Sequence, residues 1–153
     1  MAVMVTPTEA VEDPLAMAEA AVLGTIAIPG RGEQVRVARA FVAGVLRELA
    51  APDEAVLDSV TLLTSELVTN AIRHSRSGES GGSVRLVVLA VTDGIRIEVT
   101  DSGSADGSPV VKDDIYTCDG HGLFLVEAVA DQWGYRRAGA STTVWFGLGL
   151  RGD

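Results

Sequence analysis

The chain has few cysteines and few basic residues. It contains one cysteine, Cys118, and two histidines, His74 and His121, among 153 residues. An internal disulfide is therefore excluded, and a tetrahedral zinc site lacks enough Cys and His ligands. Lys and Arg total 12 against 21 Asp and Glu, which gives a formal net charge of −9. This balance disfavours a direct nucleic-acid partner, because phosphate contacts need clustered cations.

Long hydrophobic runs are also missing, and we expect no signal peptide. No apolar run approaches the roughly 20 residues that span a bilayer. Residues 1–20 carry acidic side chains where a signal peptide would be basic and then apolar. We therefore expect a cytoplasmic protein without a membrane partner. The hydrophobic content of 47% is globular, and the length fits one domain. We expect a flexible tail over 1–20 and a single domain over 21–153.

Hydrophobic periodicity predicts the order strand, helix, helix, strand, strand, loop, helix, strand, strand. The expected strands cover 22–28, 84–88, 95–99, 132–136 and 142–148, and the expected helices cover 35–50, 53–74 and 123–130. Asp53 is a plausible N-cap, and Asp93-Gly94 is a strong hairpin turn. Alternation along 95–100 predicts a sheet with one face packed on helices and the other partly wet. The fold class is therefore α+β, a two-layer sandwich of helices on a mixed, mainly antiparallel sheet.

The second expected helix carries a polar pair, Glu66 and Asn70, on an apolar background. At about 100° per residue, both lie together on the edge of the stripe formed by apolar residues such as Leu63 and Leu67. Carboxylate and carboxamide oxygens suit Mg²⁺ or an attacking hydroxyl. A solvated helix edge has the same spacing, because i,i+4 polar pairs are common on helix surfaces. The pair alone leaves both interpretations open.

Two glycine-bearing segments add candidate ligand contacts. Asp101-Ser102-Gly103 follows a strand, and its carboxylate could accept a hydrogen bond from an exocyclic amine, although a plain strand-ending turn has the same sequence. Residues 102–119 have no clear period, which is typical of a lid or binding loop or of disorder. Gly120-His121-Gly122 then precedes an apolar helix, where free amides could receive phosphate oxygens. A simple helix-entry turn explains that segment equally well.

The chain resembles the GHKL ATPase superfamily in the order of five features. These are the Glu-x-x-x-Asn pair, Asp-x-Gly, the lid-like loop, Gly-x-Gly and Ser141-Thr142-Thr143. Within this superfamily, the chain is most similar to the anti-sigma-factor serine/threonine kinases of bacteria. The resemblance covers about 22–148, and its most specific stretches are 65–74 and 120–134. It implies the histidine-kinase-like ATPase fold, also called the Bergerat fold, with ATP and Mg²⁺ as cofactors.

The resemblance also implies roles for individual residues. Glu66 would be the catalytic general base, and Asn70 would hold the Mg²⁺. Asp101 would accept a hydrogen bond from the adenine amino group, and Thr143 would contribute near the adenine side. The full expected ATP-binding set is Asn70, His74, Asp101, Gly103, Gly120, His121, Gly122, Leu123 and Thr143.

The function implied by the resemblance is phosphorylation of a serine or threonine on an anti-anti-sigma partner of STAS type, with regulation of transcription by partner switching. A sigma factor is the other expected partner, and a homodimer is reasonable. An alternative is a non-catalytic ATP-dependent protein-binding module. Three departures from the family pattern favour it, namely Ala105, Asp119 and His121. A second alternative is the ATPase half of a histidine kinase, for which we would expect a helical hairpin with a phosphoacceptor histidine.

Overall fold

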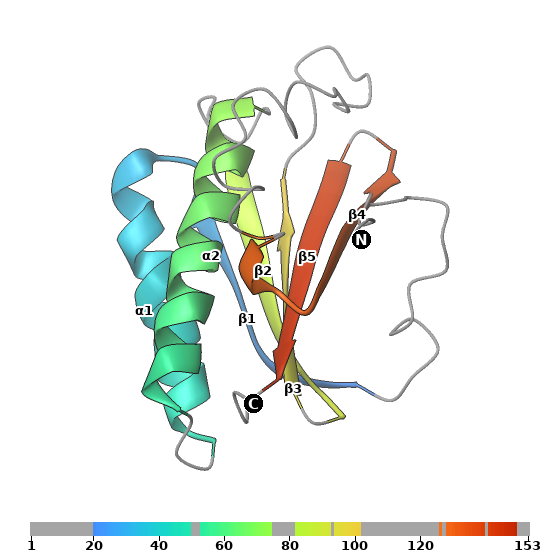
Figure 1. Cartoon of the computed structure of the whole chain (residues 1–153). Coiled ribbons are helices and arrows are strands. Elements are labelled where there is room, and N and C mark those ends of the chain that lie inside the picture. The colour runs from blue at the N-terminus through green and yellow to red at the C-terminus, as the bar shows by residue number, and fades with distance from the viewer. Residues whose placement is uncertain are drawn as a thin grey trace.

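A computed structural model describes residues 20–49, 53–74, 82–92, 94–101, 126, 128–139 and 141–149. Its elements follow the predicted order (Figure 1). The strands are β1 (Ala21–Pro29), β2 (Ser83–Val91), β3 (Gly94–Thr100), β4 (Gln132–Ala138) and β5 (Ser141–Gly149). The helices are a short 3-10 turn, η1 (Gly32–Gln34), then α1 (Val35–Arg47) and α2 (Glu54–His74). The third expected helix is described only in part, and Val126, Ala128 and Val129 are helical.

The strands form one sheet in the order β1-β2-β3-β5-β4. Figure 1 shows α1 and α2 side by side on one face of this sheet. The first helix contacts β1 and β2, and the second contacts β2, β3 and β5. The predicted two-layer α+β class is confirmed. Each pairing between the described strands is antiparallel, so within this part of the chain the sheet has no parallel pair and is not mixed.

The beginning of α2 follows from local chemistry. The Ala55 N–H donates to Oδ1 of Asp53 at 2.9 Å, which confirms Asp53 as the N-cap. Along the helix, Val60, Leu63 and Val68 are fully buried. These side chains face α1 and the sheet, as the apolar stripe predicts.

The length and composition of α2 also meet the requirements for a membrane span. Within the described residues, the segment Glu54–Arg73 is the one helix that is long and apolar enough, with a hydropathy of 1.2. This finding qualifies the expectation that no apolar run approaches a bilayer-spanning length. It is weak evidence for a membrane span, because the core helix of a soluble domain passes the same test. Here 39% of the segment is buried within the domain.

The two faces of the sheet have different chemistry. On β3, Ile95, Ile97 and Val99 point toward the helices and join the core, together with Phe146 of β5. Successive side chains of a strand alternate between faces. Arg96 therefore lies on the face away from the helices, yet only 2% of it is exposed. The expectation that this face is partly wet is wrong at Arg96.

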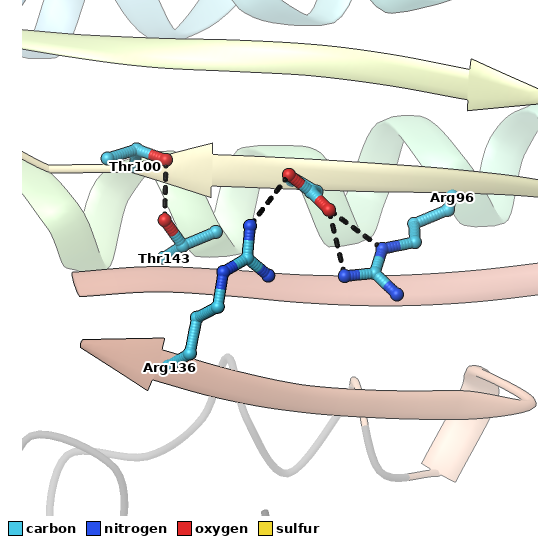
Figure 2. Close-up of polar contacts among 5 residues, drawn as sticks. Arg96, Thr100, Arg136 and Thr143 are labelled. Atoms are coloured by element: carbon cyan, nitrogen blue, oxygen red, sulfur yellow. Dashed lines mark hydrogen bonds and ion pairs between the residues drawn. The ribbon is translucent and has the colours of Figure 1, made fainter. Parts of the chain in front are cut away.

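A polar layer explains how this arginine is buried (Figure 2). We use that name for Arg96, Glu98, Arg136 and Trp145. The Arg96 guanidinium donates to Glu98 Oε2 from Nη2 at 2.8 Å and from Nε at 2.9 Å. Glu98 Oε1 lies 3.3 Å from Nη2 of Arg136 on β4. The Arg96 guanidinium also lies 3.9 Å from the centre of the Trp145 ring, a cation–π contact. The charge is thus compensated on two sides.

The first residue of β3 tests how tightly β3 and β5 approach. A Cβ added at Gly94 would lie 2.5 Å from the carbonyl oxygen of Leu148 and 3.3 Å from Cα of Gly149. Because backbone atoms of a sheet cannot move aside cheaply, we expect Gly94→Ala to destabilise the protein by about 1–3 kcal/mol. Urea denaturation would measure this change.

Gly44→Ala is the matched control. Gly44 is an exposed α1 residue whose added Cβ would meet nothing within 4 Å. Ala is the better helix former, so this variant should be more stable by up to about 1 kcal/mol. If Gly94→Ala left the denaturation midpoint unchanged or raised it, as Gly44→Ala should, the close approach at Gly94 would be contradicted.

Candidate functional site

Three segments that are distant in sequence meet at one end of the domain. Figure 1 shows the C-terminal end of α2, the end of β3 and the start of β5 at this end. The β3–β5 ladder finishes with the pair Thr100 and Thr143. Asp101 therefore lies directly after the C-terminal end of β3. Asn70 and the last residue of α2, His74, belong to the same end. The expected adenine and metal residues are therefore brought to one region.

Backbone contacts fix the position of Asp101. Its Oδ1 accepts the Thr142 N–H at 3.0 Å, and its own N–H donates to the Thr142 carbonyl oxygen at 3.0 Å. Counting two residues at a time from Ile97 and Val99 places Asp101 on the helix-facing side of the sheet. The carboxylate is thus held at a strand end beside the layer that carries α2.

The two threonines that follow Ser141 point to opposite faces. Thr142 shares a face with Val144 and Phe146, which pack in the core, and therefore with Asp101. Thr143 lies on the other face, where its hydroxyl is 2.7 Å from that of Thr100 (Figure 2). Thr143, expected near the adenine side, does not share a face with Asp101. Alternation counted back from Phe146 is the sequence signal that would have indicated Thr142.

The hydroxyl of Thr142 is a buried polar group without a partner. Thr142 is 1% exposed, and its Oγ1 makes no hydrogen bond to any described residue. A buried hydroxyl without a partner is costly. Among the described residues, Thr64 Oγ1 and Trp133 Nε1 are in the same state, but Thr142 is the one whose backbone contacts the Asp101 carboxylate. A ligand with a polar edge, held by the Asp101 carboxylate, would supply the missing partner. The pair could recognise a heterocycle that carries both a donor and an acceptor.

Glu66 and Asn70 occupy the border of α2, as the helix geometry predicts. Both are half-buried, whereas Leu63 and Leu67 on the adjoining face are buried. Within the described residues, no group of three or more His, Cys, Asp or Glu side chains could hold a metal ion. A single amide such as Asn70 suits Mg²⁺ only if other oxygens complete the shell, because Mg²⁺ usually keeps waters and phosphate ligands.

Several predicted site residues lie outside what the structure describes. These are Gly103, Gly120, His121, Gly122 and Leu123, together with the side chain of His74. Their roles stay predictions.

An antiparallel five-stranded sheet with helices on one face and an aspartate held at the strand end defines a two-layer α+β domain. The sequence profile of the histidine kinase-like ATPase domain matches residues 28–148. The chain belongs to this family.

Relatives within the family are serine-protein kinases named RsbW. One from Listeria monocytogenes is 27% identical over 118 residues, which cover 70% of this chain and 74% of the relative. One from Bacillus pumilus is 28% identical over 118 residues, which cover 69% of this chain and 72% of the relative.

A crystal structure of the RsbU and RsbW domains of a Mycobacterium tuberculosis protein has a similar fold, with a TM-score of 0.61 and 21% sequence identity. The similar region covers 83% of this chain but 32% of the larger one. At this identity the likeness shows the fold alone.

The unpartnered Thr142 hydroxyl leads to a stability prediction. Thr142→Val keeps the branched shape and removes a buried group without a described partner, so the free protein should be as stable or up to about 2 kcal/mol more stable. Thermal or urea unfolding without nucleotide would measure the difference.

Thr143→Val is the matched control, because it breaks the hydroxyl pair with Thr100. It should cost about 1 kcal/mol or more. Equal losses in both variants would mean that the Thr142 hydroxyl has a partner in the folded protein.

Proposed function

We propose that this protein binds ATP with Mg²⁺ and transfers the γ-phosphoryl group to a serine or threonine of a partner protein. In this proposal Asp101 and Thr142 hold the adenine, and Asn70 contributes to the Mg²⁺ shell. Glu66 is the general base. His74, Gly103, Gly120, His121, Gly122 and Leu123 complete the nucleotide site, as the family pattern implies.

The Asp101–Thr142 pair is the observation that carries the nucleotide assignment. Adenine presents an exocyclic amine that donates and ring nitrogens that accept. The clamped Asp101 carboxylate matches the donor, and the buried Thr142 hydroxyl matches an acceptor. A site built around such groups selects against a base without the amine, because the hydrogen bond from the amine to the carboxylate would be lost.

The polar pair on α2 supports the transfer chemistry. Glu66 and Asn70 stand one helical turn apart in the C-terminal half of α2, the half that leads to the end of the domain where Asp101 lies. Bound Mg²⁺ would neutralise phosphate charge. Glu66 would orient the partner's hydroxyl and accept its proton as the oxygen attacks the γ-phosphorus. The bond from that phosphorus to the β,γ-bridging oxygen breaks, and ADP leaves. Such a reaction needs positioning more than covalent help from the protein.

The kind of partner follows from the relatives. RsbW proteins are named serine-protein kinases, and their similarity to this chain supports a protein serine as phosphoryl acceptor. We propose an anti-anti-sigma protein of STAS type as the substrate and a sigma factor as the alternative binding partner, within the cytoplasm. Phosphorylation of the first would then determine whether the second is held or released.

A second function has specific support in the sequence. Ala105 stands where the family usually has a second glycine, and Asp119 places a carboxylate beside the expected phosphate segment. Both changes oppose triphosphate binding in a catalytic geometry. They favour a protein-binding module that uses ATP for stability and transfers no phosphate. Phosphoryl transfer to a partner distinguishes the two functions.

Asp101→Asn tests the adenine assignment. Asparagine keeps an oxygen that accepts the Thr142 N–H, so the strand ends stay joined, but it loses the charge that attracts the amine. We expect ATP affinity to fall by about 10-fold or more. Isothermal titration calorimetry with and without Mg²⁺ measures this. If ATP bound the variant and the wild type equally, Asp101 would not be an adenine ligand.

Glu66→Gln tests the catalytic assignment. The amide cannot accept the hydroxyl proton, so transfer to a partner serine should slow by about 100-fold or more, while the ATP dissociation constant changes little. A radiolabel transfer assay with the purified partner, beside calorimetry, separates the two effects. Asn70→Ala is the comparison variant and should weaken Mg²⁺-ATP binding under either function. A Glu66→Gln variant with wild-type transfer would refute the general base.

A further inference from the structure

We infer that the hydroxyl pair Thr100–Thr143 is a positioning device for Asp101. By holding the Asp101 carboxylate in place, this pair determines how well the site distinguishes adenine from a purine that lacks the 6-amino group. This inference rests on the proposed nucleotide function. Neither threonine touches the base, because both side chains lie on the face away from the helices, opposite Asp101.

The Thr100–Thr143 pair lies directly next to Asp101 in the two strands, on the opposite face of the sheet. Thr100 and Thr143 are the last partners of the β3–β5 ladder, and their hydroxyl oxygens are 2.7 Å apart. Asp101 follows Thr100 in the chain, and Thr142 precedes Thr143. The two strand ends are therefore joined on both faces. The Asp101 carboxylate joins them on the helix side, and the threonine pair joins them on the other side.

The surroundings make this hydroxyl contact effective. Thr143 is 9% exposed, and hydrogen bonds are stronger where water is largely excluded. On β4, the residue opposite Thr143 is Arg136, which is ion-paired to Glu98 (Figure 2). The start of β5 is thus held between β3 and β4. Without the hydroxyl pair, the two strand ends would lose their side-chain hydrogen bond on this face.

The consequence is confined to one property of the site. Asp101 lies beyond the last ladder pair, so its carboxylate follows any movement of the strand end. A small displacement would weaken the hydrogen bond to the amine and leave contacts to sugar and phosphates on other segments unchanged. If the threonines had only a structural role, their substitution would alter the melting temperature alone and leave base selectivity unchanged.

The experiment measures the dissociation constants of Mg²⁺-ATP and of Mg²⁺-purine riboside triphosphate, which lacks the amine, by calorimetry. Their ratio is compared in wild type, Thr100→Val, Thr143→Val and Thr143→Ser. We expect the preference of wild type for ATP to fall by about five-fold or more in both valine variants, because discrimination depends on one well-placed hydrogen bond. Serine keeps the hydroxyl and should restore the preference.

A double variant separates positioning from stability. Each single valine leaves the other hydroxyl unpartnered and lowers the melting temperature. Thr100→Val with Thr143→Val removes both hydroxyls, so the melting temperature should recover in part while the ratio stays low. Thr25→Val, an exposed threonine of the edge strand β1, is the matched control and should keep the wild-type ratio.

The outcomes distinguish this inference from the function on which it rests. A wild type that does not bind ATP, or does not prefer it, refutes the adenine assignment and the inference together. A wild type that prefers ATP, with valine variants that keep its ratio despite a lower melting temperature, refutes positioning and leaves the adenine site standing.

Discussion

The antiparallel ladder between β3 and β5 is the constraint on which the rest of the structure depends. It lies inside the sheet order, between β2 and β4, and it joins segments from opposite sides of the glycine-bearing region. A slip of one residue would exchange the faces of every side chain in one strand. Phe146 would leave the core, and Trp145 would enter it. Because that exchange is so unfavourable, the register is well determined, and the register brings Asp101 beside Thr142.

Side chains on the face away from the helices also constrain the register of the β3–β5 ladder. Arg96 is buried there, and a buried cation is tolerated only when paired. Glu98 supplies the counter-charge and Trp145 a flat ring. Gly134 lets that ring lie against β4, since an added Cβ would approach the ring to 3.0 Å. The polar layer therefore attaches the edge strand β4 to the centre of the sheet. The threonine pair that we propose as a positioning device lies at its end.

The predictable features of this protein lie within single elements. Helix geometry alone places Glu66 and Asn70 on the same border of α2, and a side-chain oxygen at Asp53 is enough to begin that helix. The hairpin of β2 and β3 follows from two alternating runs, but the expected turn is wrong at Gly94, which is the first residue of β3 and pairs with Val91. Thr143 shows the limit. The motif identifies a pair of adjacent threonines, but the face of each depends on which strand residues reach the core.

The sequence by itself determined the order of the elements, the two-layer class and the residues at each strand or helix end, because these depend on local periodicity and capping. Only the tertiary structure decided that Asp101 is clamped by the Thr142 backbone, and that Arg96 is buried rather than wet. It also decided which of the two threonines faces the helices. The physical reason is that these properties depend on register and on partners far along the chain, which no local pattern specifies.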